Sequence, residues 1–281
     1  MEIIRTIAEM KAALLPHRKE GKIIGFVPTM GYLHKGHLSL IKRARQSSDI
    51  VVMSIFVNPI QFGPQEDLKR YPRDLNGDAR LAKAEGVNYI FHPSSAEMYP
   101  PDFKTYVEVT ELSDKMCGRS RPGHFRGVTT VVLKLFNIIQ PHIAFFGQKD
   151  AQQAIIIRRM VEDLGLGIKI EILLLVREED GLAMSSRNTY LNPQERKAAL
   201  VLYRSLKLAE KMIKQGERNS AKIVQQMKEL IGREPLAKID YISITDNNHL
   251  QELTIIEDKA LIALAVYIGR IRLIDNMVIQ V

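Results

Sequence analysis

The sequence contains almost no cysteine and no long apolar segment. Cys117 is the single cysteine among 281 residues, which excludes an internal disulfide framework and is typical of a reducing compartment. With one cysteine and dispersed histidines, a structural zinc site is not expected. No apolar run approaches the roughly 18 residues of a membrane span, and the stretch MEIIRTIAEMKAALLPHRKEG is charged throughout, without the apolar centre of a signal peptide. We therefore expect a cytoplasmic protein with no membrane partner.

The sequence also lacks a basic tract, although its formal net charge is +8. A positive charge suits nucleic acid, but it suits a polyanionic small molecule equally well. The basic residues are interleaved with acids, as in QERKAALVLYRSLKLAEK, and no run of five or six basic residues occurs. Solvated surface is therefore the favoured interpretation of the charge, and no nucleic-acid partner is expected.

Strand-like and helix-like segments alternate up to about residue 176. The strand candidates are KIIGFVPT, DIVVMSIFVN, VNYIFHP, IAFFG and IKIEILLLV, and helical segments such as EDLKRYPRDLNGDARLAKAEG lie between most of them. This alternation predicts an α/β fold, a Rossmann-like doubly wound, mostly parallel sheet with helices on both faces. Ligands of such sheets bind at the carboxyl ends of the strands. We predict that residues 1–176 form this domain.

The pattern changes in the last third of the chain. REEDGLAMSSRNTYLN is polar, which is typical of a linker or an active-site loop. Asn192 as N-cap, Pro193 at the first helical position and Glu195 at the third predict a helix that ends at Gly216. A second helix, SAKIVQQMKELI, and the strands IDYISITD, ALIALAVYI and IRLIDNMVI follow. Residues 177–281 are therefore predicted to form a smaller α+β domain.

Two histidines lie three residues apart in PTMGYLHKGHLSLIKRA, between a strand-like run and a segment with helical spacing. Composition alone predicts only about 0.01 such patterns in this chain, so the pattern favours a function over chance. If a helix begins near Gly36, His34 and His37 lie at its N-terminus, where unpaired N–H groups and the helix dipole favour an anion. Gly36 adds no side chain, so a base or a phosphate can approach the backbone. The pair therefore suits a polyphosphate on which charge develops.

Five motifs follow one another along nearly the whole chain: FVPTMGYLHKGHLSL, SIFVNPIQFGPQEDLKRYPRDLNGD, RPGHFRGVTTVVLKLFNIIQP, AFFGQKDAQQ and MSSRNTYLN. Together they resemble the pantothenate synthetase (pantoate–β-alanine ligase) family, which belongs to the nucleotidylyltransferase superfamily with a His-x-Gly-His motif. The resemblance implies an AMP-forming carboxylate–amine ligase of pantothenate biosynthesis. Pantoate would attack the α-phosphorus of Mg-ATP to give pantoyl adenylate and pyrophosphate, and β-alanine would then expel AMP. It also implies a homodimer.

The resemblance assigns most of the site residues to ATP. His34, His37 and Lys149 are the expected catalytic residues, with His37 as proton donor and Lys149 as a mobile charge on the phosphates. MSSRN resembles a degenerate Lys-Met-Ser-Lys-Ser loop of the synthetases, whose Ser185, Ser186 and Arg187 would contact the departing pyrophosphate. Val176 would contact the nucleotide through its main chain. The complete expected ATP-binding set is Met30, Gly31, Tyr32, Leu33, His34, Lys35, Gly36, His37, Gly147, Gln148, Lys149, Asp150, Val176, Met184, Ser185, Ser186 and Arg187.

Three further residues are assigned by the same resemblance. Gln61 in NPIQF and Gln153 in KDAQQ match the pantoate-binding glutamines, and Gln61 would also border the β-alanine site. An amide can donate to a carboxylate without adding a charge that would trap the nucleophile. Magnesium needs few protein ligands because ATP supplies phosphate oxygens. Asp78 matches an acidic position near the metal, while the preceding acid of the family falls on Gly77.

Other polar residues receive a structural interpretation, and two other functions stay open. A buried, inert thiol is expected at Cys117, and RPGHFRG suits a loop over an anionic ligand. The histidines outside the motifs are expected to be structural: His17, His92, His142 and His249. One alternative function is another nucleotidylyltransferase that acts on a small anionic substrate, against which NPIQF and GQKDAQQ argue. The second is an RNA-binding module derived from a synthetase, which predicts salt-sensitive RNA affinity.

Overall fold

The computed structural model describes residues 1–64 and 66–281. Its chain divides into two compact units, which do not follow a single cut in the sequence. The first unit comprises Met1–Ser113, Arg121–Gly147 and Ile156–Leu174, and the second comprises Asp114–Ser120, Gln148–Ile155 and Leu175–Val281. Each unit is built around a sheet of its own.

Within the described residues, the first unit contains a parallel sheet of six strands. The strands are β1 (Glu2–Ile4), β2 (Ile24–Thr29), β3 (Ile50–Ile55), β4 (Tyr89–Phe91), β5 (Ile143–Gly147) and β6 (Lys169–Leu173). Their order across the sheet is β1-β4-β3-β2-β5-β6, and every adjacent pair is parallel. The predicted Rossmann-like sheet is therefore confirmed.

The strand order reverses between β2 and β5. From β2 the chain proceeds to β3 on one side of the sheet, whereas β5 pairs with β2 on the other side, with Phe26 opposite Ala144. Because both strands are parallel, their carboxyl ends, Thr29 and Gly147, lie at the same edge of the sheet. Ligands of open α/β sheets bind at such a reversal. This edge is therefore where the first unit is expected to bind a ligand.

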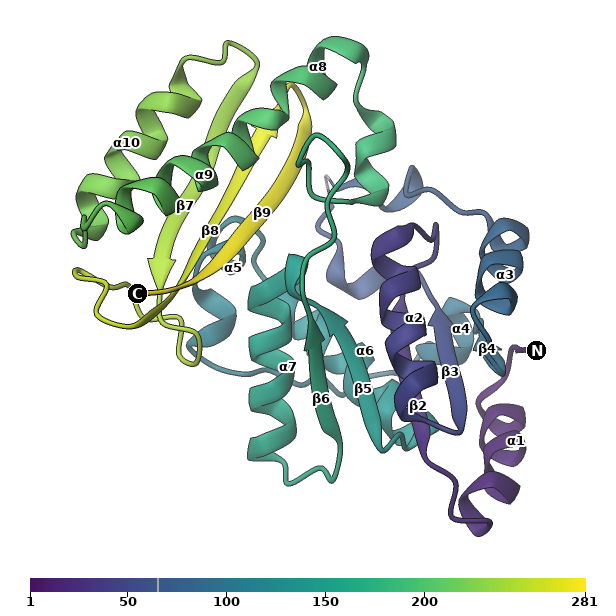
Figure 1. The fold of residues 1–281 in the computed structure, drawn as a ribbon. Helices are drawn as coiled ribbons and strands as arrows, with labels where there is room; N and C mark the ends of the chain where they lie inside the picture. Colours follow the sequence, from purple (N-terminus) through teal and green to yellow (C-terminus); the bar gives the residue numbers. More distant parts are fainter. Residues whose placement is uncertain (65) are drawn as a thin grey trace. The chain divides into compact units, whose positions relative to one another are not determined.

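Helices cover both faces of the parallel sheet (Figure 1). α2 (Lys35–Ser47) packs on β2, β3 and β5 and contacts α3 (Leu75–Ala84), and the buried side chains there include Val27 and Phe145. Phe26, next to Val27, meets Phe136 of α6 (His124–Ile139) edge-on, with ring centroids 6.3 Å apart. Since neighbouring residues of a strand point to opposite faces, α2 and α6 lie on opposite faces. α1 (Ile7–Lys19) contacts α6.

Short helices and one longer helix complete the part of the chain before residue 191. The longer helix is α7 (Ala151–Asp163), which begins in the second unit and ends in the first. The short ones are α4 (Ser95–Met98), α5 (Cys117–Ser120), and the 3-10 turns η1 (Pro59–Gln61), η2 (Asp67–Lys69), η3 (Leu112–Asp114), η4 (Gln148–Asp150) and η5 (Ser186–Tyr190).

The second unit is built on an antiparallel sheet of three strands, β7 (Ala237–Thr245), β8 (Lys259–Ile268) and β9 (Ile271–Gln280), within the described residues. The order is β7-β8-β9. Two helices, α9 (Leu200–Lys214) and α10 (Ser220–Gly232), lie side by side on one face of this sheet (Figure 1). Their apolar sides bury a core that includes Leu206, Met227 and Leu264. The predicted smaller α+β architecture is therefore confirmed.

The helix predicted from Asn192 to Gly216 is instead two helices, α8 (Pro193–Ala198) and α9. Its start is as predicted, because Asn192 Oδ1 accepts the Glu195 N–H at 2.9 Å and Glu195 Oε2 accepts the Asn192 N–H at 3.0 Å. The break lies at Ala199. Its carbonyl accepts the Leu202 N–H at 3.2 Å, which is an i→i+3 hydrogen bond of the 3-10 type and makes a tighter turn than an α-helix. α9 ends before Gly216, which has a φ of 97°.

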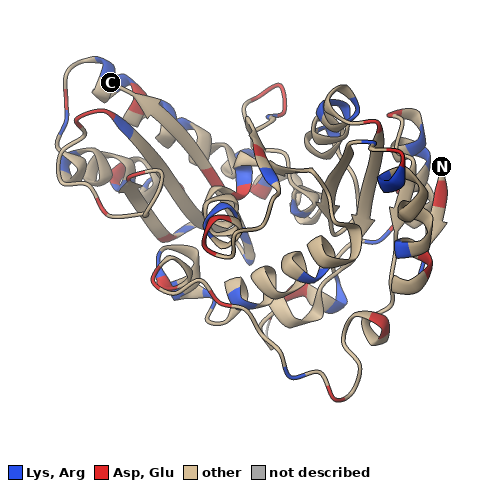
Figure 2. Cartoon of the chain, turned by 90° about the horizontal axis from the view of Figure 1, so that it is seen from below, with Lys and Arg blue, Asp and Glu red and all other residues tan. Residues whose placement is uncertain are grey.

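Charges of both signs are spread over the helices and loops of each unit. Figure 2 shows Lys and Arg interspersed with Asp and Glu, as the sequence suggested. Within residues 1–64 and 66–281, none of the helices combines the length and the apolar character that a membrane span requires.

Candidate active site

A buried carboxylate holds the turn between β2 and α2, where residues 30–37 lie. Asp78 of α3 is 3% exposed, and its Oδ2 and Oδ1 accept the N–H groups of Tyr32 and Leu33 at 2.8 and 2.7 Å. Burial raises the pKa of Asp78, and the two N–H donors oppose that rise. Tyr32 has a φ of 55°, a left-handed conformation that is strained for a residue with a Cβ. Asp78 therefore stabilises a strained turn just before the histidine pair.

Two glycines of this turn leave space that neighbouring side chains fill. Gly31 has a φ of 85°, and a Cβ there would lie 2.8 Å from Asp78 Oδ2. A Cβ at Gly36 would lie 2.9 Å from Cε1 of His34. The space at Gly36, which the sequence suggested would admit a base or a phosphate, therefore receives the imidazole ring of His34.

His34 and His37 cap the first turn of α2 reciprocally. His34 is the N-cap residue, and its Nδ1 accepts the Gly36 N–H at 3.2 Å. His37 reaches back, and its Nδ1 accepts the His34 N–H at 3.3 Å. The two imidazoles thus take the places that Ser or Thr and Glu have in an ordinary capping box. Their ring centroids lie 4.0 Å apart, so the structure brings together the two expected catalytic histidines.

The capping bonds assign the proton of each imidazole. A ring nitrogen that accepts an N–H carries no proton of its own, so the neutral forms of His34 and His37 both carry the proton on Nε2. Protonation of Nδ1 would remove the acceptor and break the cap. In its neutral form each ring is therefore an Nε2–H donor at a helix N-terminus, where the dipole and the main-chain N–H groups favour an anion.

A chain of hydrogen bonds orients Gln61, which follows β3 in η1. Asn58 is 1% exposed, and its Nδ2 donates to Gln61 Oε1 at 2.9 Å. The hydroxyl of Tyr99 donates to Asn58 Oδ1 at 2.7 Å, and burial raises the pKa of Tyr99, which keeps this donor protonated. Gln61 Nε2 lies 3.3 Å from the sulfur of Met30. The structure therefore places Gln61 beside the turn of residues 30–37. Sequence reasoning did not single out Asn58 or Tyr99.

His124 of α6 holds the main chain of Gln61. Its Nε2 lies 2.8 Å from Arg121 Nη1, and its Nδ1 lies 2.8 Å from the carbonyl oxygen of Gln61. Because a guanidinium only donates, Nε2 accepts and Nδ1 donates to Gln61. Arg121 also donates two 2.7 Å hydrogen bonds to Glu66. Burial opposes ionisation of Glu66, but Arg121 outweighs it and lowers the pKa of that carboxyl. Arg121 and His124 of the loop predicted to cover an anion thus bind protein groups around Gln61.

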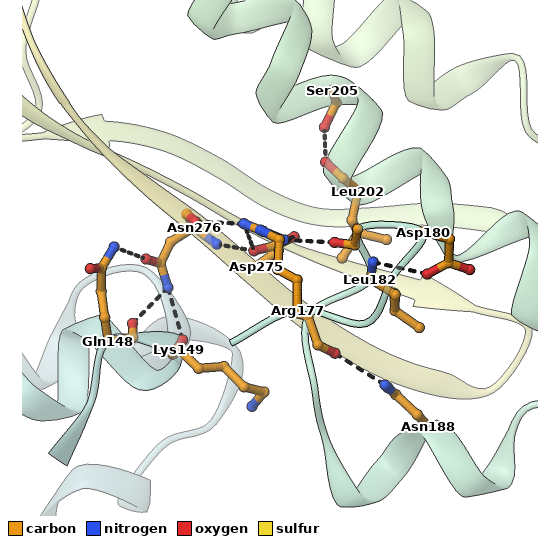
Figure 3. Close-up of polar contacts among 12 residues, drawn as sticks. Gln148, Lys149, Arg177, Asp180, Leu182, Asn188, Leu202, Ser205, Asp275 and Asn276 are labelled. Carbon is orange, nitrogen blue, oxygen red and sulfur yellow. Dashed lines mark hydrogen bonds and ion pairs between the residues drawn. The ribbon is translucent and has the colours of Figure 1, made fainter. Parts of the chain in front are cut away.

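In the second unit, η4 carries Lys149 directly after the end of β5. The Lys149 side chain is 22% exposed, and its Nζ lies 3.6 Å from Oδ2 of Asp150, which is 48% exposed. A partly exposed pair at this long distance contributes little to stability. The main chain of this turn is held by Asn276 of β9 (Figure 3), a residue that sequence reasoning missed.

The polar segment that carries Val176 and the MSSRN motif folds back on itself. Met184 N donates to the carbonyl of Val176 at 3.1 Å, which brings two of the predicted nucleotide-binding residues together. Ser185 Oγ accepts the Arg187 N–H at 3.2 Å and begins η5, in which Ser186 is buried. This segment, expected to be a linker or an active-site loop, is therefore an ordered turn.

The two glutamines at the start of α7 have different surroundings. Gln152 is 5% exposed, and its amide binds the Cys117 N–H at 3.0 Å and the Lys115 carbonyl at 2.8 Å. Gln153, the one assigned to pantoate, is partly exposed. Cys117 is free and buried, as expected of a structural thiol.

The described residues supply few candidate ligands for a metal ion. No group of three or more His, Cys, Asp or Glu side chains in residues 1–64 and 66–281 could hold one. Both oxygens of Asp78 already accept a main-chain N–H, although each keeps a second lone pair. A role of Asp78 near magnesium therefore stays a prediction.

The position of the histidine pair relative to the sheet indicates the class of protein to which the first unit belongs. Residues 30–37 follow β2 at the point where the strand order reverses. Open α/β sheets bind ligands at this point, and phosphates bind at the N-termini of the helices there. The first unit is therefore a Rossmann-like fold of the nucleotide-binding class.

Within that class, the chain belongs to the pantoate–β-alanine ligase family, whose model matches residues 2–278. A pantothenate synthetase of Caldicellulosiruptor saccharolyticus is 58% identical over 281 residues, which cover 100% of both chains. The crystal structure of pantothenate synthetase from Thermus thermophilus has a TM-score of 0.94 at 46% identity, with 99% of each chain covered. The pantoate–β-alanine ligase of Francisella tularensis, complexed with β-γ ATP and β-alanine, has a TM-score of 0.79 at 34% identity, with 99% and 97% covered. The predicted family is confirmed.

Proposed function

We propose that the chain condenses pantoate with β-alanine in two steps that consume one ATP. A pantoate carboxylate oxygen attacks the α-phosphorus, the bond to the β,γ-pyrophosphate breaks, and pantoyl adenylate forms. The amine of β-alanine then attacks the adenylate carbonyl, loses a proton and expels AMP. The family membership over residues 2–278 supports this reaction, and so does the Francisella relative complexed with β-γ ATP and β-alanine.

The observation that carries the proposal is the pair of imidazoles at the start of α2. His34 and His37 both have Nδ1 bound to a main-chain N–H, so their ring protons lie on Nε2. Two such donors match a triphosphate whose oxygens gain charge as the bond to pyrophosphate breaks. The attacking group is already an anion, so the protein mainly positions groups and neutralises charge. This explains why no catalytic Ser or Cys is needed.

The other ATP contacts are proposed from two further segments. Lys149 would bind the β- and γ-phosphates as a mobile charge, next to Gly147, Gln148 and Asp150. Ser185, Ser186 and Arg187 would bind the departing pyrophosphate, and Val176 and Met184 would contact the nucleotide. The ammonium and guanidinium groups of these segments form charge-assisted hydrogen bonds with phosphate oxygens, which are stronger than neutral ones.

Gln61 and Gln153 would bind pantoate, and Gln61 would border β-alanine as well. The hydrogen bond from Asn58 to Gln61 Oε1 supports the role of Gln61, because it leaves the amide N–H₂ group as the part of the side chain that can donate to an acid. An amide donor holds the carboxylate without the ion pair that would lower its reactivity.

Magnesium is proposed to arrive with ATP, whose phosphate oxygens and water would supply most of its ligands. Asp78 is the carboxylate that would lie near the ion. When bound, the ion would neutralise the phosphates. A homodimer and a cytoplasmic location are also proposed, and light scattering that finds only monomers would contradict the first of these.

The products test the proposed reaction. With ATP, pantoate and β-alanine, we expect one AMP, one pyrophosphate and one pantothenate per turnover. A nucleotidylyltransferase that keeps its product would release pyrophosphate and accumulate a nucleotidyl compound, with no AMP on addition of β-alanine. That result would contradict the proposal.

A further inference from the structure

Asn276, in the last strand of the second unit, binds the turn that carries Lys149 with its whole amide group. Asn276 is 3% exposed. Its Nδ2 donates to the carbonyls of Gln148 and Lys149, both at 2.9 Å, and its Oδ1 accepts from Gln148 Nε2 at 3.1 Å (Figure 3). An amide has two N–H donors, so both are used on the main chain of η4.

The backbone of Asn276 is itself held by a buried ion pair. Asp275 is 2% exposed, and Arg177 donates to its two oxygens at 2.7 and 2.9 Å. The same carboxylate accepts the Asn276 N–H at 2.7 Å, and Arg177 Nη2 donates to the Asn276 carbonyl at 3.3 Å. The guanidinium also lies over the ring of Tyr203, 4.5 Å from its centroid. Asp275 and Arg177 therefore hold the main chain from which the amide of Asn276 extends.

A strand that served only to pack the small sheet would not need this residue. β9 has the sequence IRLIDNMVIQ, in which Leu273 and Ile279 belong to the apolar core. Burying an amide is unfavourable unless its polar atoms find partners, and Asn276 finds its side-chain partners in η4. Two adjacent buried polar residues also break the alternation of a half-buried strand. The cost of burying the Asn276 amide is offset at the turn, not in the sheet.

We infer that Asn276 is a positioning residue that fixes the main chain of Lys149, and this inference rests on the proposed function of Lys149. A lysine is a flexible chain with a point charge at its end. Fixing the carbonyls of residues 148 and 149 restricts where the ammonium group can reach, and small displacements of such groups lower rates strongly. Removing the amide should therefore impair the step that involves the β- and γ-phosphates.

The test compares the two half-reactions in Asn276→Ala, Asn276→Ser and Asn276→Asp. The first half-reaction is pantoate-dependent ATP–pyrophosphate exchange, and the second is the aminolysis of preformed pantoyl adenylate by β-alanine. We expect exchange to fall about 10- to 100-fold while aminolysis keeps a much larger share of its rate. Ser205→Ala is the matched control, because it removes a buried 2.7 Å hydrogen bond to Leu202 in the same unit, and it should leave both rates near wild type.

A double variant makes the test specific to Lys149. If Asn276 acts through Lys149, Lys149→Ala/Asn276→Ala should exchange no more slowly than Lys149→Ala alone, because the two changes remove one function. Multiplied losses would overturn the inference. Equal loss of both half-reactions, unchanged exchange, or failure of all three Asn276 variants to fold would overturn it as well. If Lys149→Ala itself keeps normal exchange, the proposed role of Lys149 fails first, which distinguishes the two failures.

Discussion

The amide nitrogen of Asn58 lies 2.9 Å from the amide oxygen of Gln61, and this contact decides which end of Gln61 points toward the turn of residues 30–37. With Oε1 bound by Asn58, Nε2 is directed at the sulfur of Met30, 3.3 Å away. The orientation is assigned from these partners. Gln61 therefore presents a donor beside the predicted nucleotide-binding turn.

Replacing this donor by an acceptor should weaken pantoate binding selectively. Gln61→Glu keeps an oxygen for Asn58 but turns a second, negative oxygen toward the acid, so we expect a larger rise in the KM for pantoate than in Gln61→Ala. Loss of one buried hydrogen bond costs about 1–3 kcal/mol, roughly a 5- to 150-fold change. Steady-state kinetics should also give a KM for ATP near that of the wild type. An unchanged pantoate KM in both variants would remove Gln61 from the site.

The double role of His37, as helix cap and as donor, can be separated by mutation. Glu at this position can still accept the His34 N–H, as in an ordinary capping box, but its carboxylate has no N–H donor. We expect His37→Glu to keep the melting temperature and to lose at least about 10²–10³ in the rate of adenylate formation, the usual effect of one missing donor. His37→Ala should lose the same rate and also about 1 kcal/mol of stability with the cap.

His34→Asn provides the matched variant for the other ring, because Asn is a preferred N-cap residue. It too should retain stability and lose adenylate formation, while ATP affinity measured by calorimetry changes little. Near-normal turnover of His37→Glu at saturating substrates would show that the pair serves only the helix.

Asp78→Asn tests whether the buried carboxylate serves the turn or the metal. An amide can accept only one of the two N–H groups of Tyr32 and Leu33, so an unsatisfied donor should cost about 1–3 kcal/mol and turnover should fall as the histidine pair shifts. Because Asp78 is also proposed to lie near the ion, we expect the magnesium concentration that gives half-maximal activity to rise as well. An unchanged concentration would show that Asp78 serves only the turn, whose two N–H groups its oxygens accept.

The ion pair between Glu66 and Arg121 predicts a contribution to stability that depends on pH. The pKa of Glu66 lies below its ordinary value of 4.5, so its stabilising effect is complete above that value and is lost as the pH falls through the lowered pKa. The Glu66→Gln variant has no ionisable carboxyl at this position. The difference in melting temperature between wild type and Glu66→Gln should therefore shrink from about pH 6 to about pH 3. A constant difference would show that the ion pair contributes nothing.

Much of this fold could be predicted from local patterns. Largely apolar segments predicted the strands β2, β3 and β5, because such segments are typical of buried parallel strands. β1 was missed because it has three residues, of which only Ile4 is buried. The order of strands could not be derived, since it depends on pairings between segments that are distant in the sequence. The break at Ala199 interrupts a continuous helical pattern and leaves no local signal.

Site residues that belong to a recognisable motif were predicted from the sequence. Residues that act by holding other site residues in place were missed. His34 and His37 stand in a recognisable motif. Asn58 and His124 bind Gln61 through pairings that only the folded chain creates. Asn276 did leave a signal, because Asp and Asn stand side by side inside the apolar strand IRLIDNMVI. A buried strand carries such residues only where they have partners.

The central claim, that the chain activates pantoate as an adenylate before β-alanine takes part, is tested most directly by ATP–pyrophosphate exchange in the absence of β-alanine. Labelled pyrophosphate should enter ATP when pantoate is present, because the first step is then reversible and complete in itself. Without pantoate, exchange should fall to background. Exchange that ignores pantoate, or that requires β-alanine, would contradict the account.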